Sequence, residues 1–168
     1  KAMNRLRNKV AIVTGAVHGI GQAIATQFVQ EGASVLVTDI DEAAGRMTAD
    51  RLRASGGNAE FCLLDVAIDA DVSRAIERAS SETGRIDVLC NNAAYMGETH
   101  AALESTDYEW SKCIGIALMG THHFTQATLP YMLRQKKGSI VNVVSIQALA
   151  GMMTSAPYTA SKAALLGY

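Results

Sequence analysis

Short apolar runs alternate along this chain with longer segments that place apolar residues on one helical face. Each short run is continuously apolar and rich in Val, Ile and Leu, which is typical of parallel strands buried on both faces. Five such runs predict strands at Val10–Thr14, Ser34–Thr38, Ala59–Leu64, Ile86–Asn91 and Ser139–Val144. The pattern therefore predicts a mostly parallel sheet with helices on both sides.

The segments between these runs predict helices. Ile20, Ile24 and Phe28 recur at four-residue spacing before Gly32, a residue type that commonly ends a helix. A second apolar face lies within residues 72–79 and stops before another glycine. Both segments have the length and the period of helices that pack on a sheet.

A longer helical segment follows in the second half of the chain. Asp107 is placed to cap a helix that reaches Lys136, and Pro130 is expected to kink it near its end. Another helix is expected to begin near Pro157. Alternating strands and helices imply right-handed crossovers and a doubly wound, Rossmann-like α/β fold with three layers, αβα. No repeat or linker interrupts the pattern, so residues 1–168 are expected to form a single domain.

Composition places the chain among ordinary globular proteins. With 168 residues, of which 49% are hydrophobic and 18% charged, it is long enough to bury a sizeable core. A net charge of −1 gives no electrostatic reason to expect a nucleic acid or an anionic membrane as partner. Two long uncharged stretches, 113–133 and 138–161, contain too many polar residues to be membrane spans. Three cysteines in apolar segments are expected to be reduced core residues of a cytoplasmic protein: Cys62, Cys90 and Cys113.

A glycine-rich turn directly follows the first predicted strand, from Thr14 to Gly21. A side chain at Gly15, Gly19 or Gly21 would keep the backbone away from a bound pyrophosphate, and the helix that follows offers free N–H groups to an anion. The spacing, Thr-Gly-x-x-x-Gly-x-Gly, differs from the Gly-x-Gly-x-x-Gly of many dinucleotide-binding folds. Alone, this motif is only moderately specific, because a glycine-rich loop is more often merely a turn.

Asp39 stands at the end of the second predicted strand, 24 residues after Gly15. A carboxylate there can accept hydrogen bonds from ribose hydroxyls and would repel a 2′-phosphate. The neighbouring Ile40 offers no cation to a phosphate, and His18 is largely neutral at pH 7 unless perturbed. These residues predict NAD in preference to NADP. The alternative is that Asp39 is an ordinary capping or loop carboxylate.

Ser145 lies thirteen residues before Tyr158, and Lys162 follows four residues later on the same helix face. A free tyrosine has a pKa of about 10, too high for an efficient base at neutral pH. A lysine ammonium close by favours the phenolate. A serine hydroxyl would hold a substrate oxygen while the tyrosine moves its proton. Taken alone, Lys162 would be interpreted as a solvated surface lysine.

Together these features resemble the classical short-chain dehydrogenase/reductase family over essentially the whole chain. The motifs that carry the resemblance occur in the family's order, as Thr14–Gly21, Asp65-Val66, Asn91-Asn92-Ala93-Ala94, Ser145 and Tyr158-x-x-x-Lys162. The resemblance implies an enzyme that transfers a hydride between NAD(H) and a secondary alcohol or ketone, with Ser145, Tyr158 and Lys162 as catalytic residues. It also implies a small-molecule substrate and a homodimer or homotetramer.

The resemblance assigns the cofactor contacts as well. It implies that Asp65 and Val66 contact the adenine ring and that Lys162 also binds the nicotinamide ribose. The remaining residues implied to line the cofactor groove are Gly15, His18, Gly19, Ile20, Gly21, Asp39, Ile40, Asn91, Ala93 and Tyr158.

Three features depart from the family pattern. Ala117 stands where the family usually has an asparagine that holds a proton-relay water, and Ala94 stands where it usually has glycine. The chain also stops at Tyr168, part-way along a helix, so it is expected to lack the family's usual carboxyl-terminal part. These departures leave an alternative open, a catalytically weak or inactive NAD-binding or regulatory protein. An epimerase or dehydratase of the extended branch is a more distant alternative, because its glycine spacing usually differs.

Other residues carry weaker expectations. Met152 and Met153, and more weakly Tyr95 and Met96, are candidates for an apolar substrate wall or for filler in the core. The adjacent histidines at positions 122 and 123 point about 100° apart on a helix, so a shared metal ion is not expected.

Overall fold

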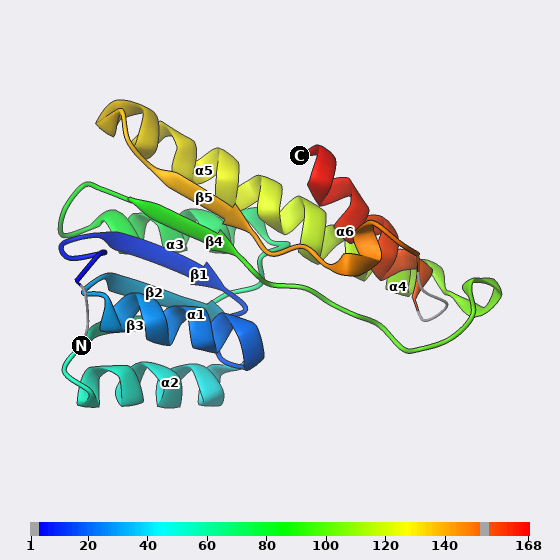
Figure 1. Cartoon of the computed structure of the whole chain (residues 1–168), viewed down its shortest axis with the longest axis horizontal. Helices are drawn as coiled ribbons and strands as arrows, with labels where there is room; N and C mark the ends of the chain where they lie inside the picture. Colours follow the sequence, from blue (N-terminus) through cyan, green and yellow to red (C-terminus); the bar gives the residue numbers. More distant parts are fainter. Residues whose placement is uncertain (1–3, 152–154) are drawn as a thin grey trace.

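A five-stranded parallel sheet forms the centre of the computed structural model, which describes residues 4–151 and 155–168. Its strands lie in the order β3-β2-β1-β4-β5, and every neighbouring pair is parallel (Figure 1). The strands are β1 (Val10–Thr14), β2 (Ser34–Asp39), β3 (Asn58–Leu63), β4 (Val88–Asn91) and β5 (Ser139–Asn142). The predicted doubly wound α/β fold is confirmed.

Helices cover both faces of this sheet, with α1 and α2 on one side and α3 and α5 on the other (Figure 1). The α-helices are α1 (Gly19–Gln30), α2 (Glu42–Ala54), α3 (Asp69–Ser80), α4 (Asp107–Cys113), α5 (Gly120–Gln135) and α6 (Ala156–Gly167). Short 3-10 turns lie at Ala102–Glu104 and Ile146–Ala148. Among the described residues, none of these helices combines the length and the apolar character needed to span a bilayer.

Alternate residues of the central strands belong to two separate hydrophobic cores, one on each face of the sheet. Ala11 and Val13 pack with Val29 of α1 on one face, whereas Ile12 packs with Phe124 of α5 on the other. Period-two alternation of side chains across a strand therefore explains why these strands are apolar without interruption.

The winding of the chain reverses at β1, which has β2 on one side and β4 on the other. In open sheets of this kind, the loops after the two strands at such a reversal separate and leave a crevice at their carboxyl ends. The loops that follow β1 and β4 carry the glycine-rich turn and the segment from Asn92 onward. The topology thus brings both predicted halves of the site to one edge of the sheet.

One helix, α2, has no counterpart among the sequence-based predictions. Its buried face consists mainly of small residues, including Ala44, Gly45 and Ala49, so it shows little hydrophobic periodicity. A side chain on Gly45 would collide with the ring of Phe61 on β3, which is why this face is small. Asp41 caps the helix by accepting a hydrogen bond from the N–H of Ala44 at 2.9 Å.

The single long helix predicted from Asp107 to Lys136 is wrong in two respects. Its cap is Thr106, whose hydroxyl accepts the N–H of Glu109 at 3.3 Å, and not Asp107, which is the first helical residue. The helix is interrupted by a π-helical segment, Ile114–Met119, which separates α4 from α5. Pro130 lies inside α5, which continues to Gln135. The sequence could not reveal a π segment, because it depends on how this helix packs against α6.

Asp87 ties the start of β4 to β1 and is almost fully buried. Its carboxylate accepts hydrogen bonds from the N–H of Val10 at 3.0 Å, from Lys9 at 2.9 Å and from Arg85 at 2.6 Å. Burial alone would raise the pKa of Asp87, but these three contacts outweigh it and hold that pKa below its usual value. The stabilisation is therefore present above the unfolded-state pKa and is lost as the pH falls through the folded-state pKa.

We predict that Asp87→Asn lowers the free energy of unfolding by about 2 kcal/mol at neutral pH, because it removes the buried carboxylate that pairs with Lys9 and Arg85. Urea unfolding at pH 7 measures this change. Asp50→Asn, which breaks only an exposed ion pair with Arg53, is the matched control and should change stability by less than about 0.5 kcal/mol. Equal effects of the two substitutions would contradict the role assigned to Asp87.

Candidate active site

Four hydrogen bonds join the end of β1 to the end of β4. The Thr14 hydroxyl accepts the N–H groups of Asn92 at 3.0 Å and Ala93 at 3.1 Å. The Asn92 side-chain amide also donates to the carbonyls of Thr14 at 3.0 Å and Gly15 at 2.8 Å. Asn92 was not among the residues predicted to form the site, although it belongs to the motif that carried the resemblance. Its position directly after a strand at the reversal point is the signal that could have identified it.

The glycine-rich turn is held tightly against this junction. Gly15 and Gly19 have φ values of 60° and 49°, in the left-handed region that favours glycine. A Cβ atom on Gly15 would lie 2.8 Å from the Cα of Ala93, so only glycine fits between the two loops. A Cβ atom on Gly19 would meet no atom within 4 Å, so the backbone at Gly19 is open to a ligand.

Helix α1 begins in the turn with its first N–H groups uncapped. His18 occupies the cap position but makes no side-chain hydrogen bond to the helix, and the first turn contains no acidic residue. Free N–H groups and the positive end of the helix dipole favour an anion at this point. These features, together with the open space beside Gly19, fit the pyrophosphate of a dinucleotide.

A pocket of about 650 Å³ extends from this turn across the carboxyl ends of the strands. Twelve of the residues predicted to form the site line it: Gly15, His18, Gly19, Ile20, Gly21, Asp39, Ile40, Asp65, Val66, Ala93, Tyr158 and Lys162. The structure thus brings the glycine turn and the Tyr-x-x-x-Lys motif into one pocket. It also adds residues that were not predicted: Leu64, Asn92, Tyr108, Lys112, Ile116, Val143 and Val144.

The β2 and β3 end of this pocket is acidic. Asp39 ends β2 and accepts the N–H of Asp41 at 3.1 Å, while Asp65 accepts the N–H of Ala67 at 2.9 Å. His18 Nε2 lies 3.6 Å from an Asp41 carboxylate oxygen. The hydrogen bond from the N–H of Ala44, with a smaller contribution from His18, lowers the pKa of Asp41.

Tyr158 and Lys162 share the opposite end of the pocket, on helix α6. Lys162 is 2% exposed, and its ammonium donates a hydrogen bond to the carbonyl of Val143 at 2.6 Å. The same nitrogen lies 5.8 Å from the centre of the Tyr158 ring. Burial lowers the pKa of Lys162, because the charged form loses contact with water. The expected one-turn relation between these two side chains is present.

Ser145 and Asn91 lie near the pocket but are not among its lining residues. The Ser145 hydroxyl accepts the N–H of Gln147 at 3.2 Å, and Gln147 in turn accepts the hydroxyl of Thr159 on α6. Asn91 is buried between strands and donates to the side chain of Asn142 at 3.0 Å. Asn91 therefore joins β4 to β5 beneath the pocket, and the corresponding lining position belongs to Asn92.

The loop between β4 and α4 forms a further wall of the pocket, through Tyr95 and Met96. Its far end is held by Glu109, which accepts hydrogen bonds from Thr106, from the N–H of Glu98 at 3.3 Å and from His100 at 2.8 Å. The hydroxyl of Ser155, which also caps α6, donates to the carbonyl of Met96 at 3.1 Å. The loop is thus attached to both helices that flank the pocket.

The departures from the family pattern occupy different environments. Ala117 is 1% exposed within the π segment, which packs against α6. Ala94 is an exposed part of the pocket wall. Met152 and Met153 lie outside the described residues.

The remaining candidate residues do not form a metal site. His122 lies 3.3 Å from the Tyr168 hydroxyl and His123 lies 3.4 Å from the Val66 carbonyl, so the two rings have different partners. Within the part of the chain that the structure describes, no group of His, Cys, Asp and Glu could hold a metal ion. The three cysteines are buried and unpaired.

Comparison with known proteins agrees with this geometry. The family model for short chain dehydrogenases matches residues 9–168. The chain belongs to this family, whose members include oxidoreductases of the same fold.

Individual relatives are similar over nearly the whole chain. Sex determination protein tasselseed-2 of Zea mays is 40% identical, and a 3-oxoacyl-acyl carrier protein reductase of Thermotoga maritima is 36% identical, each over 97% of this chain. A short chain dehydrogenase/reductase from Burkholderia phymatum, solved in complex with NAD, is 32% identical over 96% of this chain with a TM-score of 0.92. The chain spans 49%, 66% and 58% of these three proteins, respectively.

We predict that the ion pair between His100 and Glu109 makes the stability of this loop depend on pH. Hydrogen bonds, first from Thr106 and then from His100, lower the pKa of Glu109 to about 2, and its carboxylate raises the pKa of His100. The contribution of His100 to the free energy of unfolding is fully present below the unfolded-state pKa of His100. It is lost as the pH rises through the folded-state pKa of His100. His100→Gln should therefore destabilise the protein more at pH 6 than at pH 9.

Urea unfolding of the wild type and His100→Gln at the two pH values measures this difference. Glu109→Gln completes a double-mutant cycle with His100→Gln. In the Glu109→Gln background, His100→Gln should cause no pH-dependent loss of stability, because the carboxylate partner is already absent. A pH-independent effect of His100→Gln would contradict the prediction.

Proposed function

We propose that this chain transfers a hydride between NAD(H) and a secondary alcohol or ketone, using Tyr158 as acid and base. The observation that carries the proposal is that one pocket is lined by both the uncapped glycine turn and the Tyr158–Lys162 pair. Membership of the family, and the NAD complex of the Burkholderia phymatum relative, support a nicotinamide cofactor. Because the chain spans only part of its relatives, the activity of the whole protein is included in this proposal.

The chain's own residues would divide the work between binding and proton transfer. The cofactor, when bound, supplies the hydride acceptor or donor. The N–H groups at the start of α1 bind its pyrophosphate, and the open space beside Gly19 admits it. Asp39 accepts hydrogen bonds from the adenosine ribose, and Val66 packs against the adenine. Lys162 binds the nicotinamide ribose.

At the reacting end, the Tyr158 hydroxyl moves the proton of the substrate oxygen. The Lys162 ammonium is kept beside the Tyr158 ring by its hydrogen bond to the Val143 carbonyl, so its positive charge acts on the phenol from a fixed position. Ser145 would position the substrate oxygen. Its hydroxyl accepts a hydrogen bond from the backbone, which leaves the hydroxyl proton to be donated.

The proposal favours NAD over NADP. Asp39 and Asp65 make the ribose end of the pocket acidic, and Ile40 contributes an exposed apolar side chain there. His18, the nearest cationic candidate, lies against the carboxylate of Asp41. A 2′-phosphate at this end would meet like charge, which costs several kcal/mol.

The same proposal includes a small-molecule partner, a homo-oligomeric state and a cytoplasmic location. The three buried, unpaired cysteines support a reducing compartment. The family supports a small-molecule substrate, and we propose neither a nucleic acid nor a membrane as partner.

A second candidate function is that of a weakly active or inactive NAD-binding protein. The observation that favours it is the buried methyl group of Ala117, which has no donor or acceptor at the position where the resemblance implies an asparagine. NADH binding without reduction of any ketone by the intact protein would support this second function.

We predict that Tyr158→Phe abolishes turnover, reducing it by at least about a hundredfold, because it removes the hydroxyl that moves the proton. NADH affinity should be unchanged, since the ring and Lys162 remain. NADH oxidation across a panel of ketones measures turnover, and NADH fluorescence measures binding. Tyr168→Phe, at the exposed end of α6, is the control. Undiminished turnover in Tyr158→Phe would refute the catalytic assignment.

We also predict that Asp39→Asn narrows the preference for NADH over NADPH by about tenfold, because it removes the charge that repels a 2′-phosphate. Asparagine can still accept the hydrogen bond from the N–H of Asp41, so the local fold is kept. Fluorescence titrations with each dinucleotide measure the ratio without any substrate. Asp50→Asn, on the outside of α2, is the control and should leave the NADH-to-NADPH affinity ratio unaltered. An unaltered ratio in Asp39→Asn would show that the charge of Asp39 does not select the cofactor.

A further inference from the structure

Charge is distributed unevenly along the large pocket. Its carboxylates, Asp39 and Asp65, lie after β2 and β3, whereas its two lysines, Lys112 and Lys162, come from α4 and α6 beyond the other side of the sheet. The strand order β3-β2-β1-β4-β5 separates the two groups. The end of the pocket that holds Tyr158 is therefore the cationic end.

Lys112 belongs to the face of the helix that looks into this pocket. Tyr108, Lys112 and Ile116 follow one another at four-residue spacing and all three line the pocket. Lys112 is half-buried, and its ammonium lies 5.9 Å from the centre of the Tyr108 ring. Helix α4 packs directly against α6, the helix of Tyr158 and Lys162.

The ammonium of Lys112 has no carboxylate partner among the described residues. The nearby acidic residue of α4, Glu109, is occupied by His100 and by the N–H groups of Thr106 and Glu98. In contrast, Lys162 uses its ammonium to hold the Val143 carbonyl. Of the two pocket lysines, Lys112 is the one whose ammonium makes no hydrogen bond to the protein among the described residues.

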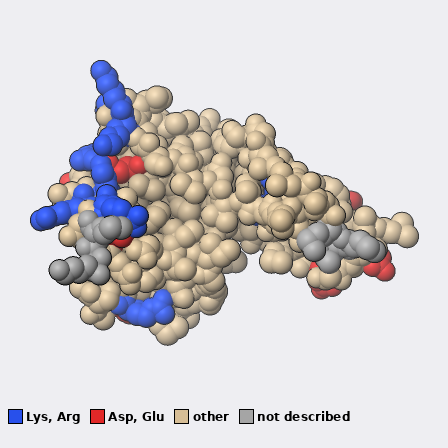
Figure 2. All heavy atoms as spheres, viewed as in Figure 1, with Lys and Arg blue, Asp and Glu red and all other residues tan. Residues whose placement is uncertain are grey.

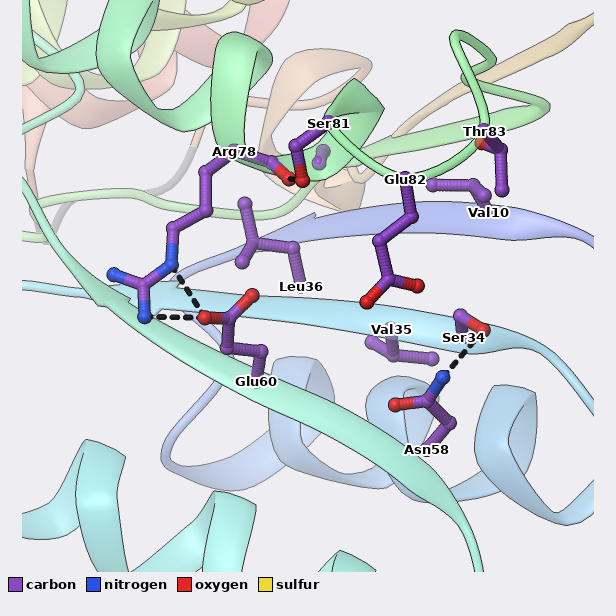
Figure 3. A pocket seen from close by; sticks show the side chains of 11 residues that line it. Val10, Ser34, Val35, Leu36, Asn58, Glu60, Arg78, Ser81, Glu82 and Thr83 are labelled. Atoms are coloured by element: carbon purple, nitrogen blue, oxygen red, sulfur yellow. Dashed lines mark hydrogen bonds and ion pairs between the residues drawn. The ribbon is translucent and has the colours of Figure 1, made fainter.

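In a second, smaller pocket, the cationic side chain is paired with a carboxylate. This pocket, of about 90 Å³, lies at the amino ends of β1, β2 and β3, and its guanidinium, Arg78, is paired with Glu60 (Figure 3). On the face seen in Figure 2, lysines and arginines gather over the left half, around the sheet, and the charged groups visible at the right end, where α4 and α6 lie, are mainly Asp and Glu. Lys112 is thus not part of a general basic surface.

We propose that Lys112 recognises an anionic group, such as a carboxylate, on the substrate. The inference rests on the proposed function, because it places the reacting carbon of that substrate at Tyr158. The substrate is then a hydroxy or oxo acid, or another alcohol or ketone with a negative group on the side that faces α4. A half-buried ammonium with an aromatic neighbour binds such a group by a charge-assisted hydrogen bond in a partly dehydrated setting.

A substrate acid and its uncharged ethyl ester test the proposal in the intact protein. Reduction of 3-oxobutanoate and of its ethyl ester by NADH gives the ratio of the two kcat/KM values. The wild type should prefer the acid. Lys112→Met should lower the acid-to-ester ratio by about tenfold, because a charged hydrogen bond is lost. Lys112→Arg should keep the preference, and Lys137→Met, an exposed lysine before β5, is the matched control.

Other outcomes would overturn the inference. If the wild type and Lys112→Met have the same acid-to-ester ratio, Lys112 does not recognise the anionic group. Loss of turnover in Tyr158→Phe would still support hydride transfer in that case. Weaker NADH binding by Lys112→Met would reassign this lysine to the cofactor.

If the wild type binds NADH but reduces neither ketone, binding of butyrate and of butyramide to the NADH complex replaces turnover. Preferential binding of butyrate that is lost in Lys112→Met supports the proposal, and its absence refutes it. Failure of the protein to bind NADH at all would refute the proposed function itself.

Discussion

The pairing of Thr14 with Asn92 is the constraint on which the rest of this site depends. Four hydrogen bonds, all donated by groups after β4 to acceptors at the end of β1, join the two strands where the sheet reverses its winding. They bring Gly15 so close to Ala93 that no side chain fits between them. The glycine turn is thus pressed against the sheet, and the uncapped start of α1 is left open toward the pocket. This junction extends the parallel pairing of β1 with β4 into the loops that line the pocket.

A buried ammonium is the second requirement of the structure. Removing the charge of Lys162 from water is unfavourable unless another group replaces the lost hydrogen bonds. The Val143 carbonyl does so, and the N–H of Val143 is itself bonded to the carbonyl of Asn91. The position of this cation beside Tyr158 is therefore determined by the pairing of β4 with β5, far from the glycine turn in sequence.

The pocket divides into two ends of opposite charge because of the order of the strands. Carboxylates follow β2 and β3, and the lysines come from helices beyond β4 and β5. An acidic end suits ribose hydroxyls, and a cationic end suits an anionic substrate. The loop between β4 and α4 joins these ends, and Glu109 and Ser155 hold it through contacts to both flanking helices.

The amino-acid sequence by itself determined the parallel α/β fold, the glycine turn and most of the pocket lining. Continuous apolar runs and glycine at left-handed positions are local properties, so they can be recognised along the chain. The helix α2 was missed because its buried face is made of small residues such as Gly45. Glycine is required at that position because the ring of Phe61 on β3 leaves no room for a side chain. Only the tertiary structure decided that Asn92 rather than Asn91 lines the pocket, that a π segment interrupts the long helix, and that Lys112 lines the same pocket as Tyr158. Each of these features depends on contacts between segments distant in sequence. The physical reason is that, where two elements pack together, their packing orients a side chain more strongly than the conformational preference of the local sequence.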